Sequence, residues 1–229
     1  IPTHNRSDFI LKAMKSIQVQ TFQDFEIIII DDGSTDNTQL VLKEYFKKFP
    51  NFKDKCKYWK FKNNCGIPTA LNKGYELASG KYVCQLSSDD WWKEDKLELQ
   101  VNYLDSNPES GLVYSNYKFV DLDDHNKTWD VNCFHSEDRS EMYKKMFEGC
   151  YLNACTFLMR IEFFREVGEY SLFYHHEWNQ DYHFNFRAIA QDKWRLAKID
   201  ESLAFITIHG GQASKQGKCG LGNDKLIPE

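Results

Sequence analysis

The sequence predicts a single α/β domain over residues 1–229, built on a mostly parallel, twisted sheet with helices on both faces. Short apolar runs alternate with helical patterns through the first half of the chain. Two acidic clusters directly follow two of these runs. The 229 residues, of which 41% are hydrophobic and 28% charged, are enough for one globular core.

The expected elements of the first half alternate in order along the chain. The run at 25–30 is apolar and rich in β-branched residues, which is typical of a buried parallel strand. Ser7 and Asp36 suit helix N-caps, and Pro68 suits the first turn of a helix. We expect strands at 25–30, 58–61, 82–86 and 112–117, and helices after Ser7, Asp36, Ile67 and Lys93. Strands that alternate with helices imply right-handed crossovers and a parallel sheet.

The second half of the chain is less regular. Residues 121–138 are polar and turn-rich, so we expect a surface excursion there. Periodicity favours helices at 161–167 and 182–190 and a strand at 203–208. The glycine-rich tail after Gly210 is expected to be flexible.

Composition and charge argue against several functions. The net charge is -5 and no basic stripe could follow a phosphate backbone, which disfavours nucleic-acid binding. Seven cysteines without a C-x-x-C pair favour reduced thiols in a cytoplasmic protein. No apolar run approaches the ~20 residues of a transmembrane segment and no signal peptide is visible, so we expect at most peripheral contact with a membrane. The abrupt start at Ile1 suggests that an N-terminal segment is missing.

The two acidic clusters are the strongest signal of a binding site. Ligands of parallel α/β sheets bind at the carboxyl ends of the strands, where both clusters are expected to lie. Asp89 and Asp90 repel each other, and a hard divalent cation would relieve this repulsion while binding phosphate oxygens. A carboxylate of residues 31–36 could accept hydrogen bonds from a nucleobase and a ribose. Helix capping explains either cluster equally well when each is taken alone.

Taken in order, several segments of residues 1–120 resemble the family 2 glycosyltransferases of the GT-A fold. The matching segments are 1–6, 20–22, 25–36, 64–74, 78–82, 88–91 and 96–97. The resemblance implies a Rossmann-like sheet of GT-A type, with a nucleotide-sugar-binding half at 1–120 and an acceptor-binding half at 121–229. It also implies an inverting, metal-dependent transfer of a sugar to an acceptor hydroxyl. The donor of this family is usually a uridine diphosphate (UDP) sugar.

The resemblance implies a donor site at the start of the chain and at the acidic clusters. Pro2 and His4 would flank the nucleobase, and His4 stands where relatives often have Tyr. Asp32 would accept a hydrogen bond from the uracil, and Asp89 would contact the ribose or the donor sugar. The expected donor-binding residues are Pro2, His4, Asn5, Arg6, Asp32, Asn72 and Asp89.

The resemblance also implies metal-binding and catalytic residues. Asp90 would bind Mn²⁺ or Mg²⁺, which acts as a Lewis acid on the departing diphosphate. His209 is a second candidate ligand, and a structural role for it is equally open. Ser87 stands where relatives commonly have a further Asp, which leaves the number of protein ligands open. Asp181, at a helix start, is the expected general base, with Glu177 in reserve.

Two other functions stay open at this stage. A nucleotidyltransferase would use a similar sheet and metal, but its Gly-rich N-terminal phosphate loop has no counterpart in residues 2–6. A non-catalytic module that binds nucleotide-sugars or carbohydrates would not need Asp32, Asp90 and Asp181 intact. The expected partners are a nucleotide-sugar donor and an acceptor that is a glycan, a protein or a lipid.

Overall fold

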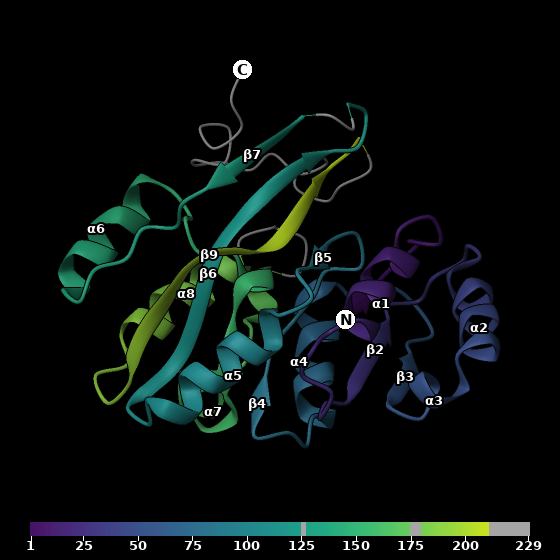
Figure 1. Cartoon of the computed structure of the whole chain (residues 1–229), viewed down its shortest axis with the longest axis horizontal. Coiled ribbons are helices and arrows are strands. Elements are labelled where there is room, and N and C mark those ends of the chain that lie inside the picture. The colour runs from purple at the N-terminus through teal and green to yellow at the C-terminus, as the bar shows by residue number, and fades with distance from the viewer. Residues whose placement is uncertain (125–126, 175–179, 211–229) are drawn as a thin grey trace.

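The computed structural model describes residues 1–124, 127–174 and 180–210. Two sheets lie side by side, with helices packed around them (Figure 1). The first is parallel, in the order β1 (Pro2–Thr3), β2 (Ile27–Asp31) and β3 (Cys56–Lys60). The second is mixed, in the order β4 (Tyr82–Val83), β8 (Leu158–Arg160), β6 (Ser110–Asp121), β9 (Arg195–Ile208) and β5 (Trp91–Trp92), with β7 (Thr128–Val131) paired to β6.

The helices confirm the expected α/β class. Helix α4 packs on β1 and β2, whereas α5 and α7 pack on β6 and β8 of the second sheet. The α-helices are α1 (Ile10–Gln18), α2 (Thr38–Lys48), α3 (Pro50–Lys53), α4 (Ile67–Leu77), α5 (Lys96–Ser106), α6 (Arg139–Glu148), α7 (Ile161–Val167) and α8 (Gln180–Ile189). Two 3-10 helices are η1 (Ala154–Thr156) and η2 (Leu172–Tyr174).

The second sheet is mixed and separate from the first, whereas the sequence predicts one mostly parallel sheet. Strands β4 and β6 both run antiparallel to β8, which lies between them. The β8 strand has three residues, too few to show a period in the sequence. The segment 121–138, expected to be a surface excursion, contains β7, which pairs antiparallel with β6. Strand β9 is longer than predicted and runs parallel to β6 along most of its length.

The helix starts follow the sequence signals only in part. Asn37, and not Asp36, occupies the N-cap position of α2, although Asp36 Oδ1 accepts a hydrogen bond of 2.9 Å from the Thr38 N–H at the start of the helix. Ser7 does not cap α1, which begins at Ile10 with Phe9 in the N-cap position. Pro68 lies in the first turn of α4 as predicted.

The core is continuous beneath both sheets. Ile27, Ile29 and Ile30 of β2 are buried, since helices and loops cover both faces of this strand. Full burial of such a side chain contributes about 1.5–3 kcal/mol. Tyr114 of β6 and Phe157, which directly precedes β8, are among the largest fully buried side chains.

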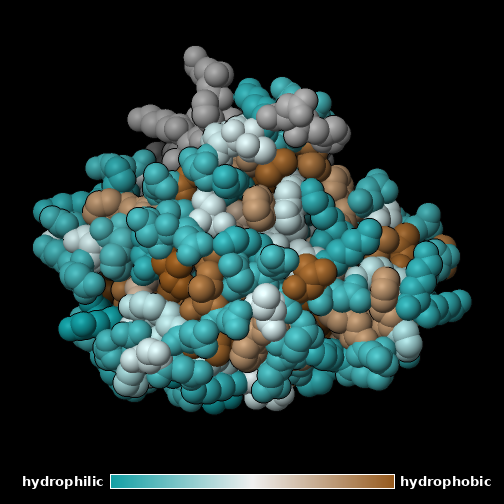
Figure 2. Space-filling model, viewed as in Figure 1, coloured by the Kyte–Doolittle hydropathy of each residue, from teal (hydrophilic) through white to brown (hydrophobic). Residues whose placement is uncertain are grey.

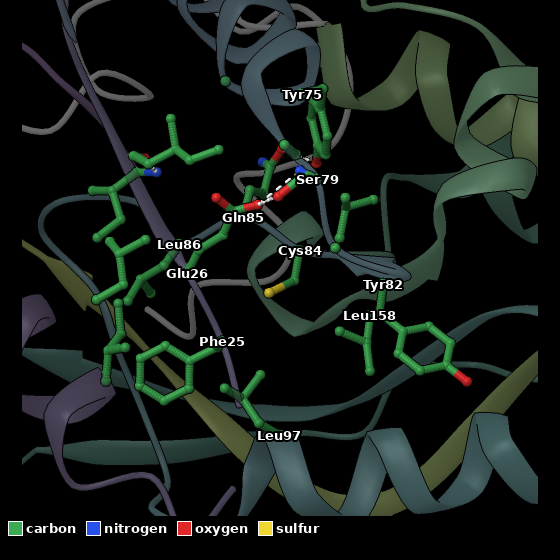
Figure 3. A pocket seen from close by; sticks show the side chains of 18 of the residues that line it. Phe25, Glu26, Tyr75, Ser79, Tyr82, Cys84, Gln85, Leu86, Leu97 and Leu158 are labelled. Atoms are coloured by element: carbon green, nitrogen blue, oxygen red, sulfur yellow. Dashed lines mark hydrogen bonds between the residues drawn. The ribbon is translucent and has the colours of Figure 1, made fainter. Parts of the chain in front are cut away.

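A cavity of about 700 Å³ opens between β2 and β4 (Figure 3). Its lining is largely apolar and includes Phe25, Leu97 and Leu158, while Glu26 accepts a hydrogen bond from Ser79 at its rim. The cavity lies where β1 pairs with β2 over only two residues. Among the described residues that line it there is no aspartate of either acidic cluster, and of the predicted donor-binding residues only Pro2 takes part in its lining.

The surface is mostly hydrophilic on the face drawn in Figure 2, with small, separated hydrophobic patches. Among the residues that the structure describes, Phe147 and Phe173 are the most exposed large hydrophobic residues. Within residues 1–124, 127–174 and 180–210, no helix combines the length and the apolar character that crossing a bilayer requires.

Candidate active site

The two carboxylates at the end of β2 have different hydrogen-bond partners. Asp31 is fully buried and accepts hydrogen bonds from the Ser34 N–H at 2.6 Å and the Tyr58 hydroxyl at 2.5 Å. Asp32 accepts hydrogen bonds from two backbone N–H groups at the start of α4, those of Cys65 at 2.6 Å and Gly66 at 2.8 Å. A carboxylate offers about four lone-pair sites, so Asp32 keeps acceptor capacity for a further donor.

Gly33 allows the chain to turn directly after these carboxylates. Its φ is +73°, and a Cβ there would lie 2.6 Å from the carbonyl carbon of Asn63. Only glycine fits this left-handed position against the neighbouring backbone. The turn brings residues 33–36 beneath the N-terminal segment of the chain.

Residues 4–6 lie against this turn. The sequence predicts that these residues and Asp32 belong to one donor site. The His4 Nδ1 lies 2.7 Å from the Asp32 carbonyl oxygen. Asn5 has a positive φ of 51°, and its Oδ1 accepts hydrogen bonds from the N–H groups of Thr35 at 2.8 Å and Asp36 at 3.2 Å. The side chain of Asn5 therefore fixes the loop and leaves His4 beside Asp32. Pro2 pairs with β2 and is half-buried.

The second acidic cluster, in the loop between β4 and β5, brings three distant segments together. Asp89 Oδ2 lies 3.5 Å from Arg6 Nε and 3.2 Å from His209 Nε2. The His209 ring also stacks on Phe9, with a centroid separation of 4.4 Å. The side chain of Asp89 is 17% exposed, so it is accessible to a ligand. Asp89 thus joins the N-terminal segment to the end of β9.

Asp90 is more deeply buried than Asp89 and has different partners. Its Oδ1 accepts a hydrogen bond of 2.9 Å from the Thr207 N–H, and its Oδ2 accepts one of 3.3 Å from the Cys155 thiol. Burial, together with the neighbouring Asp89 carboxylate, raises the pKa of Asp90. Asp89 is thus the more accessible of the two carboxylates, and the assignment of Asp90 as the metal ligand stays a prediction.

Asp89 and His209 fit a shared divalent cation. Two ligands on adjacent corners of an octahedron, each about 2.1 Å from the ion, lie about 3.0 Å apart. The observed separation of Oδ2 and Nε2 is 3.2 Å. In the part of the chain that the structure describes, no cluster of three or more His, Cys, Asp or Glu side chains could hold a metal. A cation held by two protein ligands would need substrate phosphates and water to complete its shell.

Asp181 lies in the first turn of α8, as expected for the base. Burial raises the pKa of Asp181 to about 6. Its Oδ1 is buried and has no hydrogen-bond partner among the residues that the structure describes. A buried carboxylate with spare acceptor capacity and a pKa near neutrality suits proton abstraction. Glu177, the reserve candidate, lies outside the described residues.

Asn72, expected to contact the donor, is hydrogen-bonded to the backbone of a distant segment. Its Nδ2 donates to the Tyr170 carbonyl at 2.9 Å, and its Oδ1 accepts from the Tyr170 N–H at 2.9 Å. This pair of bonds ties α4 to the segment before η2. The Tyr170 and Tyr75 hydroxyls in turn both donate to Gln85 Oε1, at 3.1 and 3.2 Å.

Three residues at the site were not predicted from the sequence. Phe9 supports His209, and Thr207 and Cys155 hold Asp90. Thr207 and Cys155 are 117 and 65 residues away from Asp90 in the chain, so no local spacing could reveal these contacts. Thr207 lies two residues before the predicted ligand His209. This short spacing is the feature of the sequence that could have pointed to Thr207.

Comparison with solved structures defines the class of protein. The fold is similar to that of S. aureus TarS, with a TM-score of 0.69 and 19% identity, over 90% of this chain and 36% of TarS. It is also similar to the mannosyltransferase PcManGT from Pyrobaculum calidifontis, solved in complex with GDP-Man and Mn2+, with a TM-score of 0.67 and 16% identity over 92% of this chain and 56% of that one. The fold is therefore that of the GT-A glycosyltransferases, and this predicted fold class is confirmed.

Sequence comparison then gives the family. The family described as "Glycosyl transferase family 2" matches residues 1–168, and the chain belongs to this family. It is 28% identical over 183 residues to an uncharacterized glycosyltransferase of Rickettsia typhi, and this match covers 78% of the chain and 55% of that protein. It is 38% identical over 103 residues to the putative teichuronic acid biosynthesis glycosyltransferase TuaG of Bacillus subtilis, over 45% of the chain and 39% of TuaG. The chain thus spans about half the length, or less, of these relatives.

Proposed function

We propose that this chain transfers a sugar from a UDP-sugar to an acceptor hydroxyl, with inversion at the anomeric carbon and with a divalent cation. The observation that carries the proposal is the meeting of Arg6, Asp89 and His209 at one edge of the fold. This edge also holds the Asp32 loop, because Asn5 contacts that loop and directly precedes Arg6. A base-binding carboxylate and a diphosphate-binding cluster are thereby adjacent.

The donor would lie across residues 4–6 and the two acidic strand ends. Asp32 accepts the imide N–H of uracil with its remaining lone pairs, and His4 stacks against the base. Arg6 has a planar guanidinium that suits phosphate oxygens. The related fold of S. aureus TarS has been solved in complex with UDP-GlcNAc, which supports a nucleotide-sugar donor of this kind.

Asp89 and His209 are the residues that would hold the metal. An imidazole and a carboxylate together favour Mn²⁺ over Mg²⁺, because Mg²⁺ is bound almost wholly by oxygen. The Mn²⁺ present in the PcManGT complex supports this choice. A bound cation supplies Lewis-acid stabilisation of the charge that develops on the departing diphosphate. Asp90, held by Thr207 and Cys155, keeps the loop that carries Asp89 in place.

Asp181 acts as the general base of the transfer. The acceptor oxygen forms a bond to the anomeric carbon while the bond from that carbon to the diphosphate oxygen breaks. The electron pair leaves with the diphosphate, and the acceptor proton passes to a carboxylate oxygen of Asp181. With a pKa of about 6, Asp181 is ionised at neutral pH and remains basic enough to accept this proton. Attack from the face opposite the diphosphate inverts the anomeric centre.

Donor hydrolysis tests this proposal without knowledge of the acceptor. The chain is incubated with UDP-glucose, UDP-N-acetylglucosamine or GDP-mannose, each with Mn²⁺, with Mg²⁺ or with EDTA. We expect slow release of nucleoside diphosphate, fastest with a UDP-sugar and Mn²⁺, because water replaces the acceptor. Release of pyrophosphate would instead indicate a nucleotidyltransferase. Binding without release under every condition would indicate a non-catalytic module, and either outcome overturns the proposal.

A further inference from the structure

The acidic loop of residues 87–92 is held against η1, a short helix more than sixty residues later in the chain. Building on the function proposed above, we infer that Cys155 is a positioning residue for this loop and thereby for the metal ligand Asp89. Cys155 is buried, with 3% of its surface exposed, and is one of the free thiols of the described chain. It contacts neither the proposed donor cluster nor Asp181 through any hydrogen bond that the structure gives.

Four interactions link Cys155 to the loop. Its Sγ accepts a hydrogen bond of 3.4 Å from the Ser87 N–H and lies 3.2 Å from the Ser87 hydroxyl. The same thiol donates to Asp90 Oδ2 at 3.3 Å. Its backbone carbonyl accepts a hydrogen bond of 2.8 Å from the Trp92 indole N–H. One residue therefore holds the beginning, the middle and the end of the loop.

The far side of the loop is fixed by a different element. On β9, the Thr207 N–H donates to Asp90 Oδ1, and the Thr207 hydroxyl donates to the Asp89 carbonyl at 3.0 Å. Asp90 is thus held from η1 on one carboxylate oxygen and from β9 on the other. Because His209 directly follows β9, the separation of Asp89 and His209 depends on how the loop lies between these two elements.

The position of Cys155 is itself determined by its neighbours. Asn153 caps η1, since its Oδ1 accepts a hydrogen bond of 2.9 Å from the Cys155 N–H. The backbone at Cys155 is therefore fixed before the thiol meets the loop. A thiol can both donate and accept, so it can satisfy Asp90 and Ser87 at once. Alanine would leave the buried Asp90 oxygen and the Ser87 N–H without this partner, which is costly. Serine would keep a donor and an acceptor at that point.

The test compares Cys155→Ala and Cys155→Ser with a matched control, Cys133→Ala. Cys133 is also 3% exposed, but it follows β7 and no hydrogen bond joins it to the acidic loop. The first measurement is hydrogen–deuterium exchange of the peptide that covers residues 87–92, without metal or nucleotide. We expect exchange in Cys155→Ala to be about 10-fold faster than in the wild type. Cys155→Ser and Cys133→Ala should stay close to the wild-type rate.

The second measurement is the Mn²⁺ concentration that gives half-maximal release of UDP from the best donor. We expect it to rise about 10-fold in Cys155→Ala, with kcat at saturating Mn²⁺ within about 3-fold of the wild type. Cys155→Ser should restore the wild-type value, whereas a purely structural role would lower thermal stability without moving this constant.

Each outcome of these measurements decides one proposal. Unchanged exchange in Cys155→Ala, or equal changes in Cys133→Ala, overturns the role of Cys155 in holding the loop. Faster exchange with an unchanged Mn²⁺ constant overturns its link to the metal site. If the wild type releases no UDP with any donor, the proposed function fails, and the exchange experiment still decides whether Cys155 holds the loop.

Discussion

The Asp89 carboxylate lies 3.2 Å from the His209 imidazole, although 120 residues separate them in the chain. Asp89 lies in the loop between β4 and β5, and His209 follows the last residue of β9. Stacking of Phe9 on His209 and the approach of Arg6 to Asp89 bring the N-terminal segment to the same point. This contact makes the two residues a pair of candidate metal ligands, and it directs the first prediction.

Asp89→Asn should remove metal-dependent nucleotide binding. The amide carries no charge, so it binds a divalent cation far more weakly than a carboxylate does. We expect the affinity for UDP in the presence of Mn²⁺ to fall about 100-fold, with little change in EDTA. Isothermal titration calorimetry measures both values. Asp105→Asn is the control, because Asp105 is an exposed carboxylate paired with Lys81. Equal Mn²⁺-dependent affinity in wild type and Asp89→Asn would contradict the assignment.

Asp90→Asn should behave differently from Asp89→Asn. The Asp90 carboxylate is buried and held by Thr207 and Cys155. Loss of its charge therefore disturbs the conformation of the loop more than the binding of the metal. We expect a loss of Mn²⁺-dependent affinity of about 10-fold or less, together with a change in thermal stability. Calorimetry and thermal melts on the same preparations separate the two effects. A complete loss of metal binding in Asp90→Asn alone would restore Asp90 as the principal ligand.

Asp181→Asn should bind nucleotide normally and lose transfer. Asparagine cannot accept the acceptor proton, and a positioned base contributes about 10²–10⁴-fold. We therefore expect kcat to fall by at least about 100-fold while the affinity for UDP stays within about 2-fold. Steady-state rates with the best donor and binding by calorimetry give both numbers. Turnover near the wild-type level would move the base to another residue, with Glu177 as the next candidate.

The rate of transfer should rise with pH through about 6. Because burial raises the pKa of Asp181 to about 6, the carboxyl is protonated and inactive below that pH and ionised above it. The native state also binds this proton more tightly than the unfolded chain does. The contribution of Asp181 to stability therefore declines as the pH rises from about 4 to about 6. The measurements are kcat against pH and urea unfolding at pH 4.5 and pH 7, with Asp181→Asn as the comparison. An acidic limb centred near pH 4 would show that the site does not raise this pKa.

Asn72→Ala should destabilise the fold without weakening the donor site. It removes both hydrogen bonds to the Tyr170 backbone, and leaving buried groups unpaired costs about 1–3 kcal/mol. We expect a lower free energy of unfolding in urea and an unchanged affinity for UDP. A large loss of UDP affinity at full stability would return Asn72 to the donor site.

The sequence by itself determined the α/β class, the family and the position of the first acidic cluster at the end of β2. These signals are local: a β-branched run at 25–30, a proline in the first turn of α4, and motifs in a fixed order. Local chain geometry determines each of them, so they can be identified without knowledge of distant contacts.

Only the tertiary structure decided which partners the adjacent acidic residues have. Adjacent positions such as 89 and 90 look alike in the sequence, but the backbone points their side chains to different neighbours. Asp90 meets the Thr207 N–H and the Cys155 thiol, whereas Asp89 meets Arg6 and His209. Strand β8 and the Asn72–Tyr170 pair likewise depend on contacts between distant segments. The chemistry of a carboxylate depends on its burial and partners, and folding alone supplies those partners.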